Sequence, residues 1–508
     1  AQDSAGQTYL PIAVRNGVLT TPGGPPSTGQ ETPLPTETAP PGSTPTPTPP
    51  PGSTPTAVPP PGSTPTVAPP PGSTPTVAPT DTPPTCEQYG ETVQRSRRFG
   101  VQMYTNTQPG SQFFDSLVVS KAGWVRVITP WGNTERQNTT PDQYDWSWVD
   151  RELDAGNHLD AEMIGTIGFA PAWAAEKTNG PIDEEDMPEF LDFVRALVER
   201  YDGDGIDDAP CGQVVTYWEL YNEPDNIRNW GHDAIRYARM LEQVYPVIKA
   251  ANPNAQVLFG GVAHDHFTDQ GGIFLRGWTD LVLQAGAGPY FDYMNFHIFA
   301  AFWQERASSP PGLKEKVEEF RAIMAANNVD KPIMITETGG LFRAEPSPET
   351  WRNQANIVYQ LFAQALATDV EVTIWWMLYD LDEVTRHTWY PGLVTSDTPP
   401  VVKPSFDAFK RSVDLLDTAE YVRQFAAEEL GHENAVTYEF VDSAVDRRIY
   451  VSWVDFEGTG TLRVPGRTAF VHDIYGGTLP IIDSADGAQD GWITIELGLD
   501  SIIAEVYD

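Results

Sequence analysis

The amino-acid sequence predicts an α/β fold, a (β/α)8 TIM barrel, with a disordered Pro-rich N-terminal tail before it and a C-terminal all-β sandwich after it. Three observations predict this architecture. Between residues 99 and 377, eight strand-like runs alternate with segments of helical length, the pattern of a parallel βα barrel. From about residue 419 the helical periodicity stops, and short runs separated by Gly, Asp and Pro turns take over, as in a β-sandwich. The first 85 residues hold 25 of the 47 prolines.

The N-terminal region is expected to be a tether. Residues 1–32 form a short segment, and residues 33–85 a linker in which Pro-Pro-Gly-Ser-Thr-Pro-Thr recurs every ten residues from Pro40. Proline fixes φ and has no backbone donor, so this linker is expected to sample extended polyproline II conformations. Attachment to a cell surface through this tail is one expectation, and an inert tail is the other.

The barrel is expected over residues 86–416 and the accessory sandwich over residues 417–508. The expected barrel strands are 99–104, 124–129, 159–165, 214–218, 256–260, 293–297, 333–336 and 372–377. Amphipathic patterns predict helices that include 187–201, 234–251, 313–327, 350–367 and 404–415. The expected sandwich strands are 436–440, 448–453, 461–464, 468–472, 492–496 and 502–506.

The charge of the chain excludes some partners. Residues 1–85 contribute −3 of the net charge of −38, so residues 86–508 carry −35. Such a surface repels nucleic acid and anionic lipid, and no run of about 18 apolar residues could span a bilayer. The sequence starts at Ala1 without Met, as if a secretory signal had been removed. A secreted protein, extracellular or at the cell surface, is therefore expected.

Two glutamates stand where a barrel enzyme carries its catalytic groups. Glu223 and Glu337 each follow an apolar run and precede turn residues, at the ends of the fourth and seventh expected strands. Catalytic residues of these barrels lie at the C-terminal ends of strands. A pair of carboxyl groups is also what hydrolysis of a glycosidic bond requires. The alternative is that both are solvated loop residues.

These residues resemble clan A of the glycoside hydrolases, whose members are retaining TIM-barrel enzymes. Asn222-Glu223-Pro224 is similar to the strand-four signature, which implies that Glu223 is the acid/base and that Asn222 binds the sugar 2-hydroxyl. Thr336-Glu337 resembles the nucleophile segment. Trp124-Val-Arg126 resembles the strand-two segment whose Arg contacts the nucleophile, with a structural ion pair as the alternative.

Two more residues carry the resemblance. His297 is similar to the strand-six His, although a satisfied buried histidine is the alternative, and Trp376 to the strand-eight Trp beneath the −1 subsite. Phe299 stands where several clan members have a Tyr. The barrel with its sandwich looks most like family 39 and related hydrolases of bacterial exopolysaccharides or plant glycans.

Aromatic residues follow several expected strand ends. Trp131 and Trp173 are candidate platforms for sugar rings, whose C–H faces are apolar, and simple packing is the alternative. The other members of this set are Phe169, Trp230, Trp303, Trp389 and Tyr390.

Two structural features are also expected. Asp202, Asp204 and Asp207, separated by Gly, predict a structural Ca²⁺ loop, with a plain Asp/Gly turn as the alternative. No cofactor is expected for catalysis. Cys86 and Cys211, the two cysteines of the chain, are expected to form a disulfide in a secreted protein, with two free thiols as the alternative.

The function expected from the sequence is that of a secreted, retaining O-glycosyl hydrolase. It would cleave β-glycosidic bonds in a polysaccharide or oligosaccharide by double displacement. The alternative is a catalytically inactive, carbohydrate-binding cell-surface protein.

Overall fold

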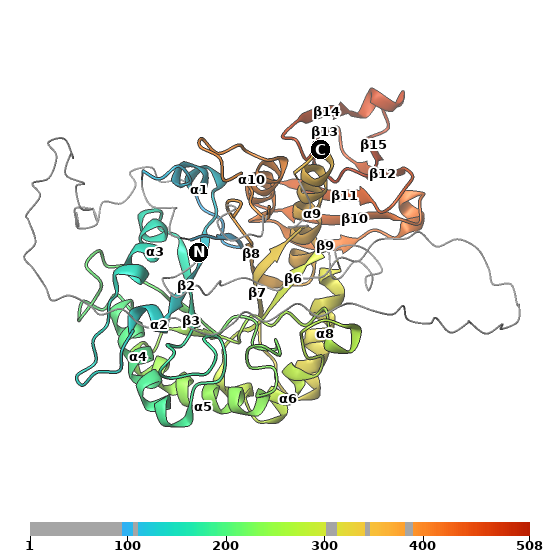
Figure 1. The fold of residues 1–508 in the computed structure, drawn as a ribbon. Helices are drawn as coiled ribbons and strands as arrows, with labels where there is room; N and C mark the ends of the chain where they lie inside the picture. The colour runs from blue at the N-terminus through green and yellow to red at the C-terminus, as the bar shows by residue number, and fades with distance from the viewer. Residues whose placement is uncertain (1–93, 105–109, 301–311, 341–345, 382–389) are drawn as a thin grey trace, which may run out of the picture. The chain divides into compact units, whose positions relative to one another are not determined.

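The computed structural model describes residues 94–104, 110–300, 312–340, 346–381 and 390–508 (Figure 1). These residues belong to one compact unit. The predicted tail and linker, residues 1–85, lie outside the described residues. None of the helices in the described ranges has the length and apolar character needed to cross a bilayer.

The first part of the structure is a barrel of eight parallel strands surrounded by helices, as predicted. The sheet order is β5-β4-β3-β2-β1-β8-β7-β6, and parallel bridges Leu258–Tyr293 and Val262–Phe296 join the two end strands. The strands are β1 (Phe99–Gln102), β2 (Trp124–Pro130), β3 (Glu162–Gly168), β4 (Tyr217–Leu220), β5 (Gln256–Leu258), β6 (Met294–Phe299), β7 (Ile333–Gly339) and β8 (Val370–Trp375).

Five helices lie where amphipathic segments predicted them, with ends that differ by at most two residues: α4 (Met187–Arg200), α5 (Ala234–Ala251), α8 (Leu313–Ala326), α9 (Pro348–Ala367) and α10 (Pro404–Leu416). The structure adds α1 (Phe114–Ser120), α2 (Trp131–Thr134), α3 (Ser147–His158) and α6 (Trp278–Gln284), for which no range was predicted. Helix α9 begins at a capping box formed by Ser347 and Thr350, which satisfies backbone donors at its first turn.

The interior of the barrel has an apolar floor. Alternate strand residues point inward, and the inward cluster consists of Trp124, Ile164, Leu258, Met334, Val372 and Ile374, with Tyr217 and Tyr293 packed against it. Outward neighbours such as Val125, Val127 and Met163 join the main core instead. Position 100, beside the floor, is a glycine, because a side chain there would collide with Trp124 and Ile374.

A polar layer lies above this floor. Five floor residues are each followed, two positions later on the same strand, by a buried polar residue. The pairs are Trp124 and Arg126, Ile164 and Thr166, Tyr217 and Glu219, Tyr293 and Asn295, and Met334 and Thr336. Because alternate positions share a face, these polar side chains meet inside the barrel, toward the C-terminal ends of the strands.

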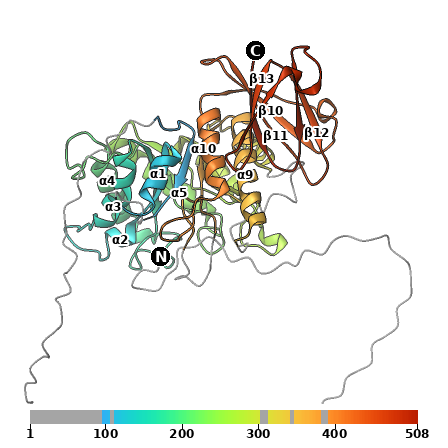
Figure 2. The ribbon, with the colours of Figure 1, turned by 90° about the horizontal axis from the view of Figure 1, so that it is seen from above.

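The C-terminal part is all-β, as predicted (Figure 2). An antiparallel sheet of order β14-β13-β16-β11-β10-β9 accompanies a two-stranded sheet of β12 and β15. Residues of the two sheets, including Tyr450 and Ala504 from one and Leu462 and Ile495 from the other, share a core. The strands are β9 (Glu420–Gln424), β10 (Ala435–Asp442), β11 (Arg447–Val454), β12 (Gly460–Pro465), β13 (Thr468–His472), β14 (Thr478–Ile482), β15 (Trp492–Leu497) and β16 (Ile502–Tyr507).

The β part contacts helix α9. Ser501 N–H donates to the Asn356 side-chain oxygen at 2.6 Å, and the Tyr359 hydroxyl donates to the Asp473 carbonyl at 3.1 Å. Residues 354–366 of α9 are buried all round the helix, as expected of a helix packed on both sides.

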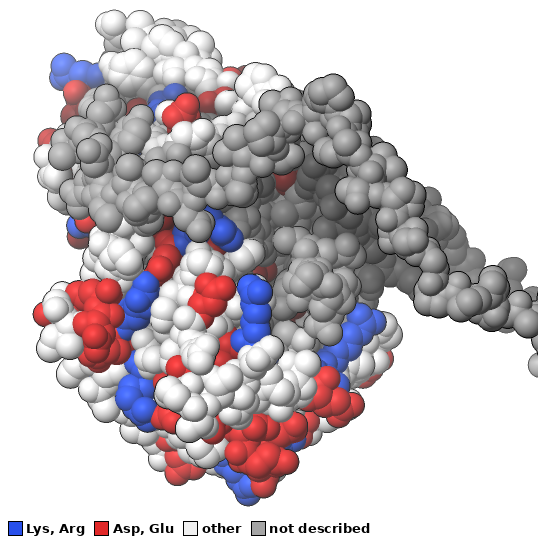
Figure 3. All heavy atoms as spheres, turned by 60° about the vertical axis from the view of Figure 1, so that its left-hand side comes forward, with Lys and Arg blue, Asp and Glu red and all other residues white. Residues whose placement is uncertain are grey.

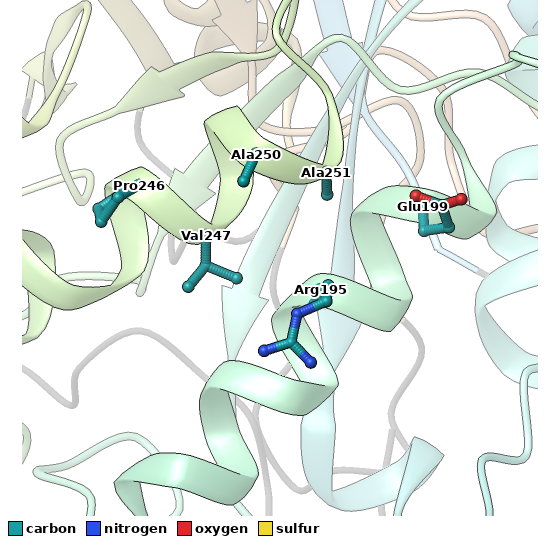
Figure 4. A pocket seen from close by; sticks show the side chains of 6 residues that line it. All are labelled: Arg195, Glu199, Pro246, Val247, Ala250 and Ala251. Atoms are coloured by element: carbon teal, nitrogen blue, oxygen red, sulfur yellow. The ribbon is translucent and has the colours of Figure 1, made fainter.

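The outer surface carries many acidic side chains. On the face in Figure 3, Lys and Arg are scattered among clusters of Asp and Glu, in keeping with the net charge. A groove of about 410 Å³ lies on the outside of the barrel between α4 and α5 (Figure 4). It is lined by Arg195, Glu199, Pro246, Val247, Ala250 and Ala251. None of the predicted site residues lines this groove.

Candidate active site

A bulge in β7 directs Glu337 into the barrel. Phe296 of β6 pairs with Ile335, but the next residue, His297, pairs with Glu337, so Thr336 is the extra residue of the ladder. Regular alternation would place Thr336 and Glu337 on opposite faces. Because of the bulge, both contact residues of the barrel interior, which is how β-bulges re-aim side chains at active sites.

Left-handed backbone conformations shape the segment after β4. Tyr221 has φ of 69° and Glu223 has φ of 45°. The Tyr221 ring packs among the aromatic residues of the outer layer, 5.0 Å from the Trp230 ring. Such conformations cost a non-glycine residue on the order of 1 kcal/mol each. Here Glu223 N–H donates to the Gly261 carbonyl at 3.0 Å, which holds the segment in place.

Glu223, His297 and Glu337 meet at the C-terminal end of the barrel. One side-chain atom of each lies within 4.8 Å of the other two, and all three side chains are buried. His297 Nδ1 is 3.4 Å from Glu223 Oε1 and 3.7 Å from Glu337 Oε2. The histidine therefore stands between the two carboxyl groups.

Arg126 binds four side chains of the site with its guanidinium group. Nη1 donates to Glu337 Oε1 and to Gln102 Oε1, both at 2.5 Å, and Nη2 donates to Asn222 Oδ1 at 2.8 Å. Nε donates to Glu219 Oε2 at 2.6 Å. Glu337 Oε2 has no hydrogen-bond partner among the described residues, so one oxygen of this carboxylate is held and the other is available.

The environment raises the pKa of both proton carriers of the site, which favours a neutral carboxyl group on Glu223 and a charged ring on His297. Burial raises the pKa of Glu223, and the charge of Glu337 raises it further, against the opposing effect of His297. Burial lowers the pKa of His297, but the charge of Glu337 and the nearby carboxylates of Glu219 and Glu223 outweigh burial and raise it to about 9. At neutral pH, Glu223 therefore favours its proton-bearing form more than an ordinary glutamate, and His297 is an imidazolium.

The same charges disfavour a metal ion between Glu223, His297 and Glu337, although their spacing could accommodate one. A histidine binds a metal through its neutral form, whereas this one carries a raised pKa. Arg126 already neutralises Glu337. The residues present therefore fit proton transfer and nucleophilic chemistry better than metal binding.

Trp376 lies beside this group. It follows β8, is 1% exposed, and meets the Phe299 ring edge-to-face with centroids 5.9 Å apart. Tyr104, just after β1, accepts a hydrogen bond from Gln102 Nε2 at 2.9 Å. Burial raises the Tyr104 pKa to about 12, with the charge of Glu337 acting in the same direction. Tyr104 thus lies close to both Glu337 and Trp376.

The structure does not support a sugar platform at Trp131. This side chain is 0% exposed and packs against Phe190 and Phe193 of α4, because its place at the start of α2 turns it toward the helix layer. Trp173 is half-buried and meets the Trp131 ring edge-to-face at 5.1 Å. Trp230 is also buried, and Trp303 and Trp389 lie outside the described residues.

The acidic loop before β4 differs in detail from the expectation. The carboxylates that lie within 4.8 Å of one another are those of Asp202, Asp204 and Asp208. Asp207 is not part of the group, and its backbone is left-handed with φ of 52°. Cys86 lies outside the described residues, so its pairing with Cys211 stays a prediction.

Several residues of the site were not predicted from the sequence. Glu219 and Gln102 bind Arg126, and Lys316 of α8 donates to the His297 carbonyl at 2.6 Å. Two buried charges, Glu219 and Lys316, lie at otherwise apolar positions of a strand and a helix. A charged residue on a core face is the signal that could have identified them, because such groups are rarely buried without a partner.

No protein-family model matches the sequence, and no curated protein matches it either. Solved structures do share its fold. A family 39 glycoside hydrolase from Bacteroides cellulosilyticus has a TM-score of 0.60 and 17% identity, over 81% of each chain. A monomeric beta-xylosidase from Caulobacter crescentus has a TM-score of 0.55 and 15% identity, over 81% of this chain and 96% of that one.

A glycoside hydrolase family 30 endoxylanase from Clostridium papyrosolvens is also similar. Its TM-score is 0.54 at 13% identity, over 82% of this chain and 98% of that one. The resemblance to clan A, with family 39 among the neighbours, is thus confirmed at the level of the fold: the chain has the barrel and β-domain architecture of these glycoside hydrolases.

Proposed function

We propose that this protein is a retaining glycoside hydrolase, with Glu337 as nucleophile and Glu223 as acid/base. The observation that carries the proposal is the arrangement of Glu337. Arg126 holds one of its oxygens, while the other has no partner among the described residues and lies beside His297 and Glu223. A carboxylate held in this way presents a free oxygen for attack on an anomeric carbon.

The separation of the two carboxyl groups supports the retaining mechanism. Their nearest oxygens lie within 4.8 Å. Retaining enzymes have carboxyl groups about 5–5.5 Å apart, whereas inverting enzymes need about 6.5–9.5 Å to admit a water molecule. A distance below 4.8 Å between the nearest oxygens favours the retaining mechanism over the inverting one.

In the proposed first step, Glu337 Oε2 attacks the anomeric carbon while Glu223 gives its proton to the departing glycosidic oxygen. The C–O bond to the leaving sugar breaks, and a glycosyl ester forms on Glu337. In the second step, Glu223 takes a proton from water, the water oxygen attacks the anomeric carbon, and the ester bond breaks. The raised pKa of Glu223 suits the first role.

The surrounding residues have supporting roles in this proposal. Arg126 orients Glu337 through the bond from its Nη1. The bond from Arg126 to Asn222 Oδ1 turns the amide so that its NH₂ group is left to bind the sugar 2-hydroxyl. Trp376 would form the floor of the −1 subsite, and Trp173 would flank the sugar beyond it.

We propose a substrate class by analogy with the similar structures. Two of the similar structures are a beta-xylosidase and an endoxylanase, and for this chain we propose a β-linked polysaccharide or oligosaccharide, such as a plant glycan or an exopolysaccharide. We also propose that the protein is secreted, either extracellular or tethered at a cell surface, and the Pro-rich repeat of the tail supports this.

A substrate panel tests this function. The purified protein is incubated with aryl β-xylosides, β-glucosides, β-galactosides and α-L-arabinofuranosides and with plant and bacterial polysaccharides, and released sugar is sized by chromatography. We expect hydrolysis of at least one substrate, lost in Glu337→Gln and kept in Glu439→Gln, a matched change of a buried carboxylate in β10. Binding of a glycan without hydrolysis would favour the inactive carbohydrate-binding protein instead.

A further inference from the structure

Glu219 is a buried carboxylate of the polar layer that accepts five hydrogen bonds. It has no role in the mechanism proposed above. It lies on β4, four residues before Glu223, and is 0% exposed. A buried carboxylate is costly unless hydrogen bonds and positive charge compensate for the loss of water. The groups that compensate for the burial of Glu219 therefore indicate its role.

The five donors come from five different parts of the barrel. Oε2 accepts from Arg126 Nε of β2 at 2.6 Å and from the Thr166 hydroxyl of β3 at 2.7 Å. Oε1 accepts from Gly261 N–H after β5 at 3.0 Å, Asn295 Nδ2 of β6 at 2.9 Å and the Thr336 hydroxyl of β7 at 2.9 Å. One anion therefore links every strand from β2 to β7.

These contacts keep Glu219 ionised. Burial raises its pKa, but Arg126 and His297 oppose burial and bring the pKa well below the ordinary range of a glutamate. Glycine at position 261 permits the approach, because a Cβ there would lie 2.6 Å from Glu219 Oε1 and 2.1 Å from His297 Nε2.

Glu219 is connected to both catalytic carboxyl groups through cations. Its bond to Arg126 Nε fixes the guanidinium plane, so that Nη1 meets Glu337 and Nη2 meets Asn222. The second connection reaches His297: Glu219 Oε1 lies 3.8 Å from His297 Nε2, beyond hydrogen-bond distance, so the hydrogen-bonded route runs through Thr336. A hydroxyl that donates to the Glu219 carboxylate can accept from His297 Nε2, which lies 3.2 Å away.

While Nε2 of His297 faces Thr336, the other ring nitrogen, Nδ1, faces Glu223 and Glu337. The charged groups around His297 are Arg126 from β2, Glu219 and Glu223 from the β4 segment, Glu337 from β7 and Lys316 from α8, which binds its backbone carbonyl. Two fixed cations, Arg126 and His297, thus balance two carboxylates, Glu219 and Glu337, and Glu223 is left to exchange its proton with substrate.

We propose that Glu219 is a positioning residue of the proposed glycosidase: it orients Arg126 on the nucleophile and, through Thr336, retains the positive charge of His297 between the two catalytic carboxyl groups. The roles of Glu337 as nucleophile and Glu223 as acid/base in this proposal rest on the proposed function. The effect of Glu219 on the charge of His297 can be measured without substrate.

The substitution Glu219→Gln tests it. A glutamine keeps the volume but puts an NH₂ group against donors, whichever way the amide turns, and removes the charge. We expect kcat/KM to fall by about 10- to 100-fold, the loss typical of residues that orient a reactive group. We expect His297 to lose its proton about 1 to 3 pH units lower than in the wild type.

The His297 titration is followed by NMR on protein labelled in its eight histidines, with His297→Gln used to assign the resonance. Glu439→Gln is the matched control, because Glu439 is a buried carboxylate bound by Arg448 at 2.8 Å and Arg423 at 3.0 Å in the β part. It should leave both kcat/KM and the His297 titration unchanged. Glu219→Asp keeps the charge and should keep His297 protonated over more of the wild-type pH range than Glu219→Gln.

Thr336→Val provides a second route if Glu219→Gln does not fold, since it removes only the hydroxyl between Glu219 and His297. It should also lower the pH at which His297 loses its proton. An unchanged His297 titration in the folded Glu219→Gln or Thr336→Val variant would overturn the proposal. Inactivity of the wild type on every glycan would contradict the proposed function alone, because the titration uses no substrate.

Discussion

Replacement of Arg126 by lysine separates the geometry of this side chain from its charge. Both residues are cations, but a guanidinium has five donors in a planar fork and an ammonium is a single point charge. Arg126 uses its fork on Glu337, Gln102, Asn222 and Glu219. In Arg126→Lys the ammonium nitrogen should lie near the former Cζ, one bond short of Nη1 and Nη2, so it should lose the Nη1 bond to Glu337 and the Nη2 bond to Asn222.

The size of the effect follows from these two lost bonds. A hydrogen bond to a charged group contributes about 1.5–3 kcal/mol, so at the lower end the two together contribute about 3 kcal/mol. At 1.4 kcal/mol per factor of ten, kcat/KM should fall by roughly 100-fold. The loss should appear mainly in kcat, because Glu337 becomes misoriented for attack rather than unable to bind a sugar.

The assay compares the initial rates of the wild type and Arg126→Lys on an activated aryl glycoside identified by the substrate panel. Arg448→Lys serves as control, since Arg448 also donates to a buried glutamate but lies in the β part. Melting curves establish that both variants are folded. A kcat/KM of Arg126→Lys within about threefold of the wild type would refute the positioning role assigned to the guanidinium.

Two further predictions concern stability. The folded-state pKa of His297 is raised to about 9 from an ordinary 6.5, so the protonated ring should contribute about 3 kcal/mol to the unfolding free energy below pH 6.5, and this contribution should be lost as the pH rises through 9. The difference in unfolding free energy between wild type and His297→Gln should therefore shrink between these pH values, and a constant difference would contradict the assignment. If the loop before β4 binds Ca²⁺, added Ca²⁺ should raise the melting temperature and EDTA should reverse it. Asp208→Asn should abolish that response while Asp207→Asn keeps it, because Asp208 is the residue grouped with Asp202 and Asp204; equal melting curves with and without Ca²⁺ would leave a plain turn.

The fold was predictable because its strands are marked by local composition. Buried parallel strands are mostly apolar runs that end at turn residues, so all eight barrel strands were predicted. Strands β9 and β14 were not predicted, because they lack this apolar composition. Every residue of β9 and most of β14 is exposed, so neither shows the apolar alternation by which a half-buried strand is recognised.

The two catalytic candidates were predictable, and the network that positions them was not. Glu223 and Glu337 follow apolar runs within short local motifs. The bulge at Thr336 and the left-handed backbone at Tyr221 arise from pairing between strands distant in sequence. Glu219 has the same alternation as an ordinary strand residue, and only the closed barrel brings its five donors together.

The roles of Glu337 and Glu223 are tested most directly by the configuration of the glycosyl azide that each alanine variant forms with an activated aryl β-glycoside. In Glu337→Ala, azide replaces the missing nucleophile and attacks the substrate, so NMR should show a product of inverted configuration. In Glu223→Ala, the glycosyl ester on Glu337 still forms and azide displaces it, so the product should have retained configuration. The opposite pattern would show that the two roles are exchanged, and full activity of either variant without azide would place the catalytic site elsewhere.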